Sequence, residues 1–295
     1  MKKIPVLKTI TYGYSFTFGH LGTIIGLIWL PMVVVAVAGY FVMSNYYGTF
    51  PTAMEQGNSV VAGQSALLVL CWSIASLLIS SVMYAAVTRQ ALGLKHGTTL
   101  INFTFGATEL RVFGAIAALL AILFFFMLVY ALAVLASAAL AASLGGAKEI
   151  GDVIGGILVI VFFFAMIYAL VRLSFLLIPA TVSEGKVGLA QSWKLTQGNF
   201  WRIFLVAIAT LGPLLLVTLA VEVAILAPGF FMPKAAASAD FDRNMQQMIA
   251  QMRATSPHLP WLYGFSFLIA PVFLGLGLGP SAFAYRALTQ KDDVH

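Results

Sequence analysis

Long apolar stretches without charged side chains alternate with short polar segments along the chain. They cover residues 21–43, 60–88, 112–147, 153–171, 203–221 and 254–285. A helix that spans a bilayer needs about 20 apolar residues, so these stretches predict six transmembrane helices. Hydrocarbon offers no hydrogen bonds to a peptide backbone, which excludes open sheets. The pattern therefore predicts an all-α, polytopic membrane protein.

Composition supports this class. Of 295 residues, 61% are hydrophobic and 9% are charged, whereas about 25% are charged in soluble domains. The first apolar run follows three lysines and resembles a signal peptide, but its polar lead is too long and its apolar part continues to Met43. We interpret it as a retained first helix, and residues 1–295 as a single membrane domain.

Basic residues predict the orientation. The predicted inner side holds Lys2, Lys3, Lys8, Arg89, Lys95, Arg111, Arg172, Lys186, Lys194, Arg202, Arg286 and Lys291, and the outer side holds Lys148, Lys234, Arg243 and Arg253. Positive residues concentrate on the cytoplasmic side of membrane proteins, so both termini should be cytoplasmic. The net charge of +6 suits anionic lipid headgroups and gives no evidence for nucleic-acid binding.

Two helix entrances are similar in sequence. "RVFGAIAALL" begins at Arg111 and "RIFLVAIATL" begins at Arg202, 91 residues later, and His20 lies a further 91 residues upstream. This spacing predicts three helical hairpins, at about 1–90, 91–182 and 183–295. Chance similarity among apolar strings is the alternative.

A segment with helical spacing of apolar residues precedes each odd-numbered span. The three sets are Ile4, Leu7, Thr11, Tyr14, Phe18 and Leu21; Leu100, Phe103, Ala107 and Leu110; and Val187, Ala190, Trp193 and Gln197. Such periodicity is typical of amphipathic helices that lie in the membrane interface. The alternative is that these segments are cytoplasmic loops.

The predicted outer loop contains another amphipathic helix, within residues 228–260. Five apolar side chains share one of its faces: Phe241, Met245, Met248, Ile249 and Met252. This face predicts a lid that packs on the membrane or on the other helices. A partner-binding face is the second possibility, because methionine surfaces adapt to different partners. A soft-metal site that includes His258 is the third, and we expect no metal.

Two further features are candidates for function. Five arginines lie at the inner ends of spans: Arg89, Arg111, Arg172, Arg202 and Arg286. They either orient the protein or bind anionic lipids between the hairpins. Glu222 is a carboxylate within an apolar run. Because it lies roughly 30 Å along a helix from Arg202, it is either an interfacial side chain near the outer boundary or part of a proton or substrate relay.

One stretch resembles a known family. "RLSFLLIPATVSEGKVGLAQSWKLTQGNFWRIF" carries Arg172, Pro179, Glu184, Gly188, Ser192, Gly198 and Arg202 in the order found in YciC-like bacterial inner-membrane proteins. It is also similar to the membrane domain attached to some glycerophosphodiester phosphodiesterases, whose catalytic barrel we do not find here. The match is specific over residues 168–205 and loose elsewhere. The resemblance implies a multi-pass protein of the bacterial plasma membrane, with no catalytic residue to carry over.

Motifs for catalysis are missing from the sequence. It contains no H-E-x-x-H, no phosphate-binding loop and no G-x-S-x-G. "GLGLGP" at 275–280 lies in an apolar run and indicates close helix packing. We therefore predict no enzymatic activity, no cofactor and no catalytic residue.

Two functions follow from these features. The first is to organise or stabilise membrane lipids, anionic ones above all, or a membrane-protein partner. The alternative is a small-molecule or ion transporter built from three two-helix repeats, for which Ser73, Ser76 and Ser80 supply a polar face on the second span. Such small hydroxyl side chains also serve ordinary helix packing.

The charge bias gives a topology prediction. Cysteines that replace Lys95 and Lys194 should be shielded from an impermeant thiol reagent in intact cells, whereas those at Gln56, Lys148 and Asn244 should react. Labelling of each single-cysteine variant measures this directly. Reaction at position 95 alone would contradict the hairpin scheme.

Overall fold

The structure is a computed structural model that describes residues 3–94, 105–143, 148–230 and 241–289. These residues form helices and their connections: α1 (Val6–Gly19), α2 (Leu21–Glu55), α3 (Ser59–Ala91), α4 (Ala107–Ser143), α5 (Lys148–Ser174), α6 (Leu177–Glu184), α7 (Leu189–Leu195), α8 (Phe200–Phe230), α9 (Phe241–Thr255), the short 3₁₀ helix η1 (Ser256–His258) and α10 (Leu259–Thr289). Six of the helices are long and apolar enough to cross a membrane, which confirms the six predicted spans.

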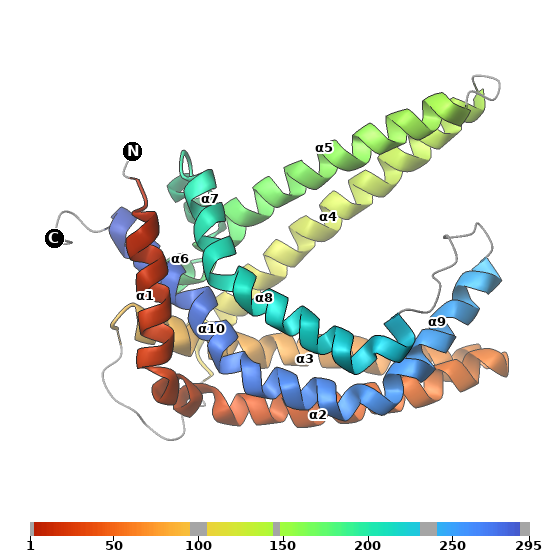
Figure 1. Ribbon diagram of the computed structural model, residues 1–295, viewed down its shortest axis with the longest axis horizontal. Coiled ribbons are helices and arrows are strands. Elements are labelled where there is room, and N and C mark those ends of the chain that lie inside the picture. Colours follow the sequence, from red (N-terminus) through yellow and green to blue (C-terminus); the bar gives the residue numbers. More distant parts are fainter. Residues whose placement is uncertain (1–2, 95–104, 144–147, 231–240, 290–295) are drawn as a thin grey trace.

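The long helices form two groups that diverge from one end of the molecule. In the first group, α2 packs along α3, and α10 lies against α2, α3 and α8 (Figure 1). In the second, α4 packs along α5, and the pair leans away from the first group (Figure 1). α10 packs more extensively on α1 and α2 than on α8. The third predicted pair is therefore integrated with the first, and the division into three repeats stays a prediction.

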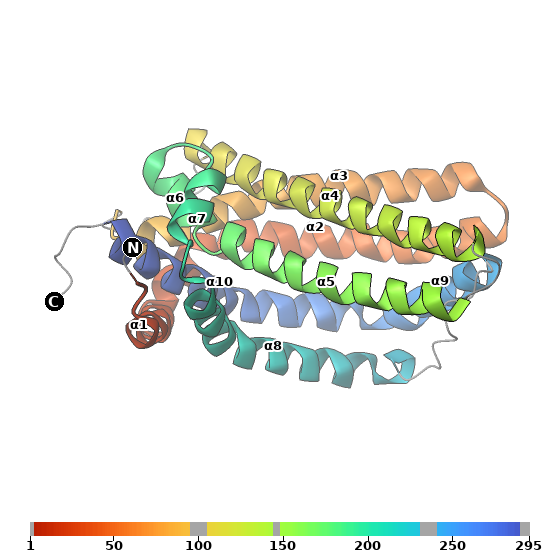
Figure 2. The same ribbon diagram turned by 90° about the horizontal axis from the view of Figure 1, so that it is seen from above.

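The two ends of the molecule differ in content. We call them the α7 end, which holds α1, α6, α7 and the last turns of α10, and the α9 end, which holds α9 (Figures 1 and 2). Helix α2 has 35 residues, or about 52 Å at the helical rise. This exceeds the roughly 30 Å hydrocarbon core of a bilayer. Helix α2 is thus long enough to continue past the core.

Helix α1 crosses the bundle instead of joining it. It runs across the direction of the long helices and packs on α10 and α8 (Figures 1 and 2). A Cβ atom at Gly13 would lie 2.5 Å from Cγ of Pro280, and one at Gly279 would lie 2.9 Å from Cδ1 of Phe16. Small residues let the two backbones approach closely where lipid gives no hydrophobic drive to association. The packing role predicted for "GLGLGP" is confirmed.

The outer face of α1 fits the predicted interfacial helix. Leu7 and Phe18 are 77% and 60% exposed, and Thr11 is exposed between them. Ile4, predicted on the same face, is instead buried. The α1 helix therefore presents an apolar face away from the bundle at the α7 end.

The other two segments that we predicted as interfacial helices do not form separate helices of the predicted length. Ala107 and Leu110 belong to the first turn of the long helix α4, so a separate interfacial helix there is wrong for these two residues. Leu100 and Phe103 lie outside the described residues. The third segment does contain a helix, α7, but it is only 7 residues long. The helix α6, which precedes it, was not predicted.

The α4–α5 pair has few neighbours along most of its length. Phe124 and Leu135 of α4 and Val153 and Phe164 of α5 are each more than 60% exposed. In the described residues α4 also contacts α3 and α6, and α5 also contacts α6, α7 and α8. In a bilayer, lipid chains would surround this pair.

The contact between α1 and α10 gives a stability prediction. In Gly13→Leu the new side chain meets the rigid ring of Pro280, and overpacking of this kind costs about 1–3 kcal/mol. The midpoint of thermal unfolding in detergent should fall. Gly22→Leu is the matched control, because nothing lies within 4 Å of a Cβ there. Equal midpoints for the two variants would contradict this account.

Candidate functional site

The connection between α5 and α8 is built around Arg172. Its side chain is buried, and its guanidinium donates to the Tyr168 hydroxyl at 2.8 Å and to the Trp193 carbonyl at 2.6 Å. It lies 3.8 Å from the centroid of the Trp193 ring. The Arg172 carbonyl in turn accepts from the Ser192 hydroxyl at 2.9 Å. Planar guanidinium groups suit such stacking and forked donation. Arg172 therefore fastens α7 to the end of α5.

Other residues of the same stretch hold the α7 end together. A Cβ at Gly188 would lie 2.8 Å from the Ala180 Cβ, so only glycine allows α7 to fold back on α6 so closely. The Tyr285 hydroxyl donates to Glu184 at 3.2 Å and ties α10 to α6. Residues that carry the family resemblance thus have structural roles in this chain.

The start of α8 holds the chain that leads into α1. The Arg202 guanidinium donates to the Ile4 carbonyl at 2.8 Å, and the Ile4 amide donates to the Asn199 side chain at 3.1 Å. Ile4 is fully buried against α5, α8 and α10 residues. These two bonds satisfy backbone groups that would otherwise be buried without partners. The Arg202 guanidinium therefore binds the backbone of this chain, although part of its side chain stays accessible.

Arg89 forms an ion pair across the connection between α3 and α4. Its guanidinium lies 2.7 Å from Glu109, whose side chain is 4% exposed. Glu109 also accepts from the Gly106 amide at 3.0 Å. A base in the last turn of α3 and an acid in the first turn of α4 both suit the helix dipoles. Arg89 is therefore neutralised within the chain.

The two remaining arginines have no acidic partner in the described part of the chain. The exposed Arg111 guanidinium lies next to Gly185, since a Cβ there would be 3.3 Å from its Nη1. Gly185 has φ +64 and ends α6, and the exposed Lys186 follows it. Arg286 lies over the Tyr12 ring at 5.3 Å. Of the five predicted arginines, Arg89 alone pairs with an acid in the described chain, Arg172 and Arg202 donate to neutral hydroxyl or carbonyl groups, and Arg111 and Arg286 make no hydrogen bond there.

The amphipathic outer helix exists, and its apolar face is largely covered by this chain. Ile249 and Met252 are each 7% exposed, and α9 packs on α2 and α8. Met245 is half-buried and Met248 is 37% exposed at the edge of the face. An ion pair between Arg253 and Glu55 ties α9 to the end of α2. The side chain of Phe241 lies outside the described part. This arrangement is that of a lid, and the partner-binding role stays a prediction.

The polar groups considered for transport lie on α3 and α8, which do not pack along each other, and the Ser80 hydroxyl makes no hydrogen bond within the described chain. Glu222 is exposed on α8, toward the α9 end. The Ser73 hydroxyl donates to the Val69 carbonyl at 2.8 Å, and the Ser76 hydroxyl to the Ser73 carbonyl at 3.0 Å. Hydroxyls that bond to their own helix are satisfied without a polar path. Within the described residues no three His, Cys, Asp or Glu side chains gather as a metal site would need.

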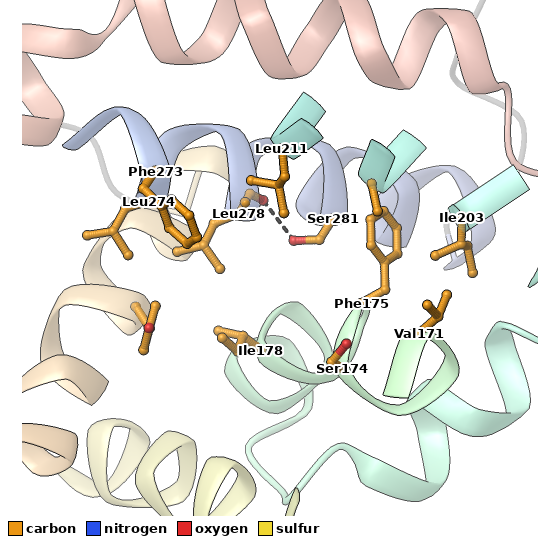
Figure 3. Close-up of a pocket in the computed structure, with 13 residues that line it drawn as sticks. Val171, Ser174, Phe175, Ile178, Ile203, Leu211, Phe273, Leu274, Leu278 and Ser281 are labelled. Carbon is orange, nitrogen blue, oxygen red and sulfur yellow. Dashed lines mark hydrogen bonds between the residues drawn. The ribbon is translucent and has the colours of Figure 1, made fainter. Parts of the chain in front are cut away.

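An apolar cavity of 220 Å³ lies where the two groups of helices separate (Figure 3). Helix α8 contributes Ile203, Ala207 and Leu211 to its wall, and α5 contributes Val171 and Ser174. Further lining residues come from the α5–α6 junction and from α3, α6 and α10 (Figure 3). It was not predicted from the sequence, because the apolar residues that line it have no spacing that separates them from the other apolar residues of the same helices.

Comparison with known proteins gives no relative. No family model, no curated protein and no solved structure matches the chain. The resemblance over residues 168–205 therefore stays a prediction. What the chain does has to be inferred from its own geometry.

Arg172 gives a prediction for the connection. Arg172→Lys keeps the charge but cannot reach both Tyr168 and Trp193, and one lost bond to a charged group costs about 1.5–3 kcal/mol. Tryptic cleavage after the exposed Lys194 should become roughly tenfold faster or more. Arg111→Lys, which breaks no hydrogen bond within the described chain, should leave that rate unchanged. An unchanged cleavage rate for Arg172→Lys would show that the hydrogen bonds from Arg172 to Tyr168 and Trp193 are not needed to hold α7 in place.

Proposed function

We propose that this chain is a multi-pass protein of the bacterial plasma membrane, of the YciC-like kind, that binds and organises anionic lipids without catalysing a reaction. One observation carries the proposal. Exposed cationic groups without an acidic partner among the described residues collect at the α7 end, on several different elements. They include Arg111, Lys186 and Lys194, and the half-buried Arg286 lies over the Tyr12 ring at the same end.

The orientation is part of the same proposal. In the described chain the basic residues at the α7 end are Lys3, Lys8, Arg89, Arg111, Arg172, Lys186, Lys194, Arg202 and Arg286, and those at the α9 end are Lys148, Arg243 and Arg253. The positive-inside rule assigns the α7 end, and with it both termini, to the cytoplasm. The cytoplasmic leaflet also carries the anionic lipids.

Neighbouring apolar side chains complete an interfacial surface. Leu7 and Phe18 are exposed on α1, which also carries Lys8, and Trp193 and Trp201 are 40% and 71% exposed on α7 and α8. Tryptophan favours the headgroup layer, and an amphipathic helix buries its apolar face just below it. These residues support a lipid-facing α7 end, where phosphates would meet the cations and acyl chains would meet α1.

Lipid organisation is better supported than transport. The hydroxyls of Ser73 and Ser76 are satisfied on their own helix, and Glu222 is exposed far from the cations of the α7 end. A partner protein at α9 would have to displace Ile249 and Met252 from their contacts, since both are buried. Lipid binding at the α7 end requires no such rearrangement.

The proposal predicts which charges hold anionic lipid. Each basic residue near such a surface contributes about 1 kcal/mol, so replacing Arg111 and Lys186 by Gln should reduce phosphatidylglycerol retention roughly 30-fold, for about 2 kcal/mol. The measurement is native mass spectrometry of protein purified in mild detergent. The control removes two charges at the α9 end, by Arg243→Gln with Arg253→Gln. If both double variants retain the same amount of phosphatidylglycerol, the charges serve orientation alone.

A further inference from the structure

The cavity of 220 Å³ between α5, α6, α8 and α10 has a lining that disfavours water. Most of its wall is aliphatic or aromatic, with Leu211, Phe273 and Leu278 among the side chains that reach into it (Figure 3). A cavity of about 150 Å³ lined by Leu, Ile and Phe excludes water and accepts a benzene molecule. The larger volume here therefore suits an apolar ligand better than a cluster of water molecules.

Three hydroxyls are the polar side-chain groups of the lining. The Ser281 hydroxyl donates to the Leu278 carbonyl at 2.9 Å and is satisfied. Within the described chain no hydrogen bond involves the hydroxyls of Tyr84 or Ser174. No charged side chain lines the cavity. A charged or highly polar solute would lose its hydration without compensation, which excludes ions and sugars as occupants.

The place of the cavity indicates where its ligand comes from. It lies where the end of α5 meets helices of the first group. Beyond this point the α4–α5 pair diverges from the first group, and many of its apolar side chains are exposed (Figure 1). Lipid chains would therefore reach it from within the bilayer. Two of its lining residues, Val171 and Ile203, directly precede or follow the basic residues Arg172 and Arg202 in the chain. The cationic end of the cavity is thus the end toward the headgroups.

We propose that the cavity binds one acyl chain of a membrane phospholipid, which enters sideways between α5 and α8. The chain fills the apolar space, and the phosphate stays in the headgroup layer near the basic residues of the α7 end. Ser174 is the last residue of α5 and lines the cavity, so its hydroxyl would be available to donate to the ester carbonyl of a bound chain. This inference rests on the proposed membrane role and adds to it a specific binding cavity for a lipid chain.

Gly277 allows the cavity to be filled without disturbing its wall. Gly277 lines the cavity, and nothing lies within 4 Å of a Cβ added there. Gly277→Leu therefore places a side chain in the empty space, and leucine favours the helix more than glycine does. Gly26→Leu on α2 is the matched control, because its Cβ is equally free and Gly26 does not line this cavity. Ala207→Leu fills the cavity from α8 and tests the same idea independently.

The experiment uses the full chain in phosphatidylcholine vesicles that contain a trace of phosphatidylcholine with a diazirine midway along one acyl chain. After illumination, mass spectrometry should find the label on cavity residues such as Leu211 and Leu278. Gly277→Leu and Ala207→Leu should each reduce this labelling about tenfold, which corresponds to 1.4 kcal/mol of binding free energy. Gly26→Leu should leave it unchanged. All variants are first shown to elute as the native protein does in gel filtration.

Two outcomes would overturn the proposal. Labelling spread evenly over the exposed faces of α4 and α5, with no loss in the filled variants, would mean that the cavity holds no chain. Labelling of the cavity by diazirine palmitate but not by the phospholipid probe would mean that its ligand is a free fatty acid. Because the phospholipid probe has a neutral headgroup, its result does not depend on Arg111 or Lys186. Failure of this site and failure of the anionic-lipid proposal are therefore distinguishable.

Discussion

Hydrocarbon provides no hydrogen-bond partners, and most features of this structure follow from that constraint. Within the long helices the hydroxyls turn back on their own backbone: Thr210 donates to the Val206 carbonyl at 2.9 Å. Where the chain leaves a helix, longer side chains supply the partners. Arg172 serves the end of α7, and Asn199 and Arg202 serve Ile4. Among the described residues, Arg172, Asn199 and Arg202 supply these partners at the α7 end, and the Asn58 side chain accepts from the Val61 amide at the α2–α3 connection.

A second consequence concerns packing. Between helices in lipid there is no hydrophobic drive to associate, so close contact depends on shape. Helix α1 meets α10 through Gly13, Gly275 and Gly279, and a Cβ at Gly275 would lie 2.7 Å from Thr17. The α4–α5 pair has no comparable contact with the first group along most of its length. The two groups of helices are close-packed at the α7 end and separate beyond it, and the cavity lies at their junction.

These two consequences together support the lipid role. Two of the five inner arginines, Arg89 and Arg172, are occupied by contacts within the chain, and a third, Arg202, holds the N-terminal segment. Arg111 and Arg286 keep their charge available at the same end of the molecule. The junction of the two groups supplies an apolar space, whose lining residues Val171 and Ile203 are the sequence neighbours of Arg172 and Arg202. A phospholipid has the matching division into a charged head and an apolar chain, so one molecule can satisfy both parts of the site.

The sequence by itself determined the number of spans, the side on which basic residues collect and the amphipathic helix α9, because each depends on local composition or on the spacing of a few neighbours. Tertiary structure alone decided which arginines are held by contacts within the chain, because the partners are distant in sequence: Arg202 and Ile4 are 198 residues apart. It also decided that Ala107 and Leu110 begin a long helix. The cavity could not be predicted from the sequence, for a further physical reason. A soluble helix shows its buried face by periodicity, but lipid and protein interior favour the same apolar side chains, so the sequence of a spanning helix does not mark which face packs and which stays open.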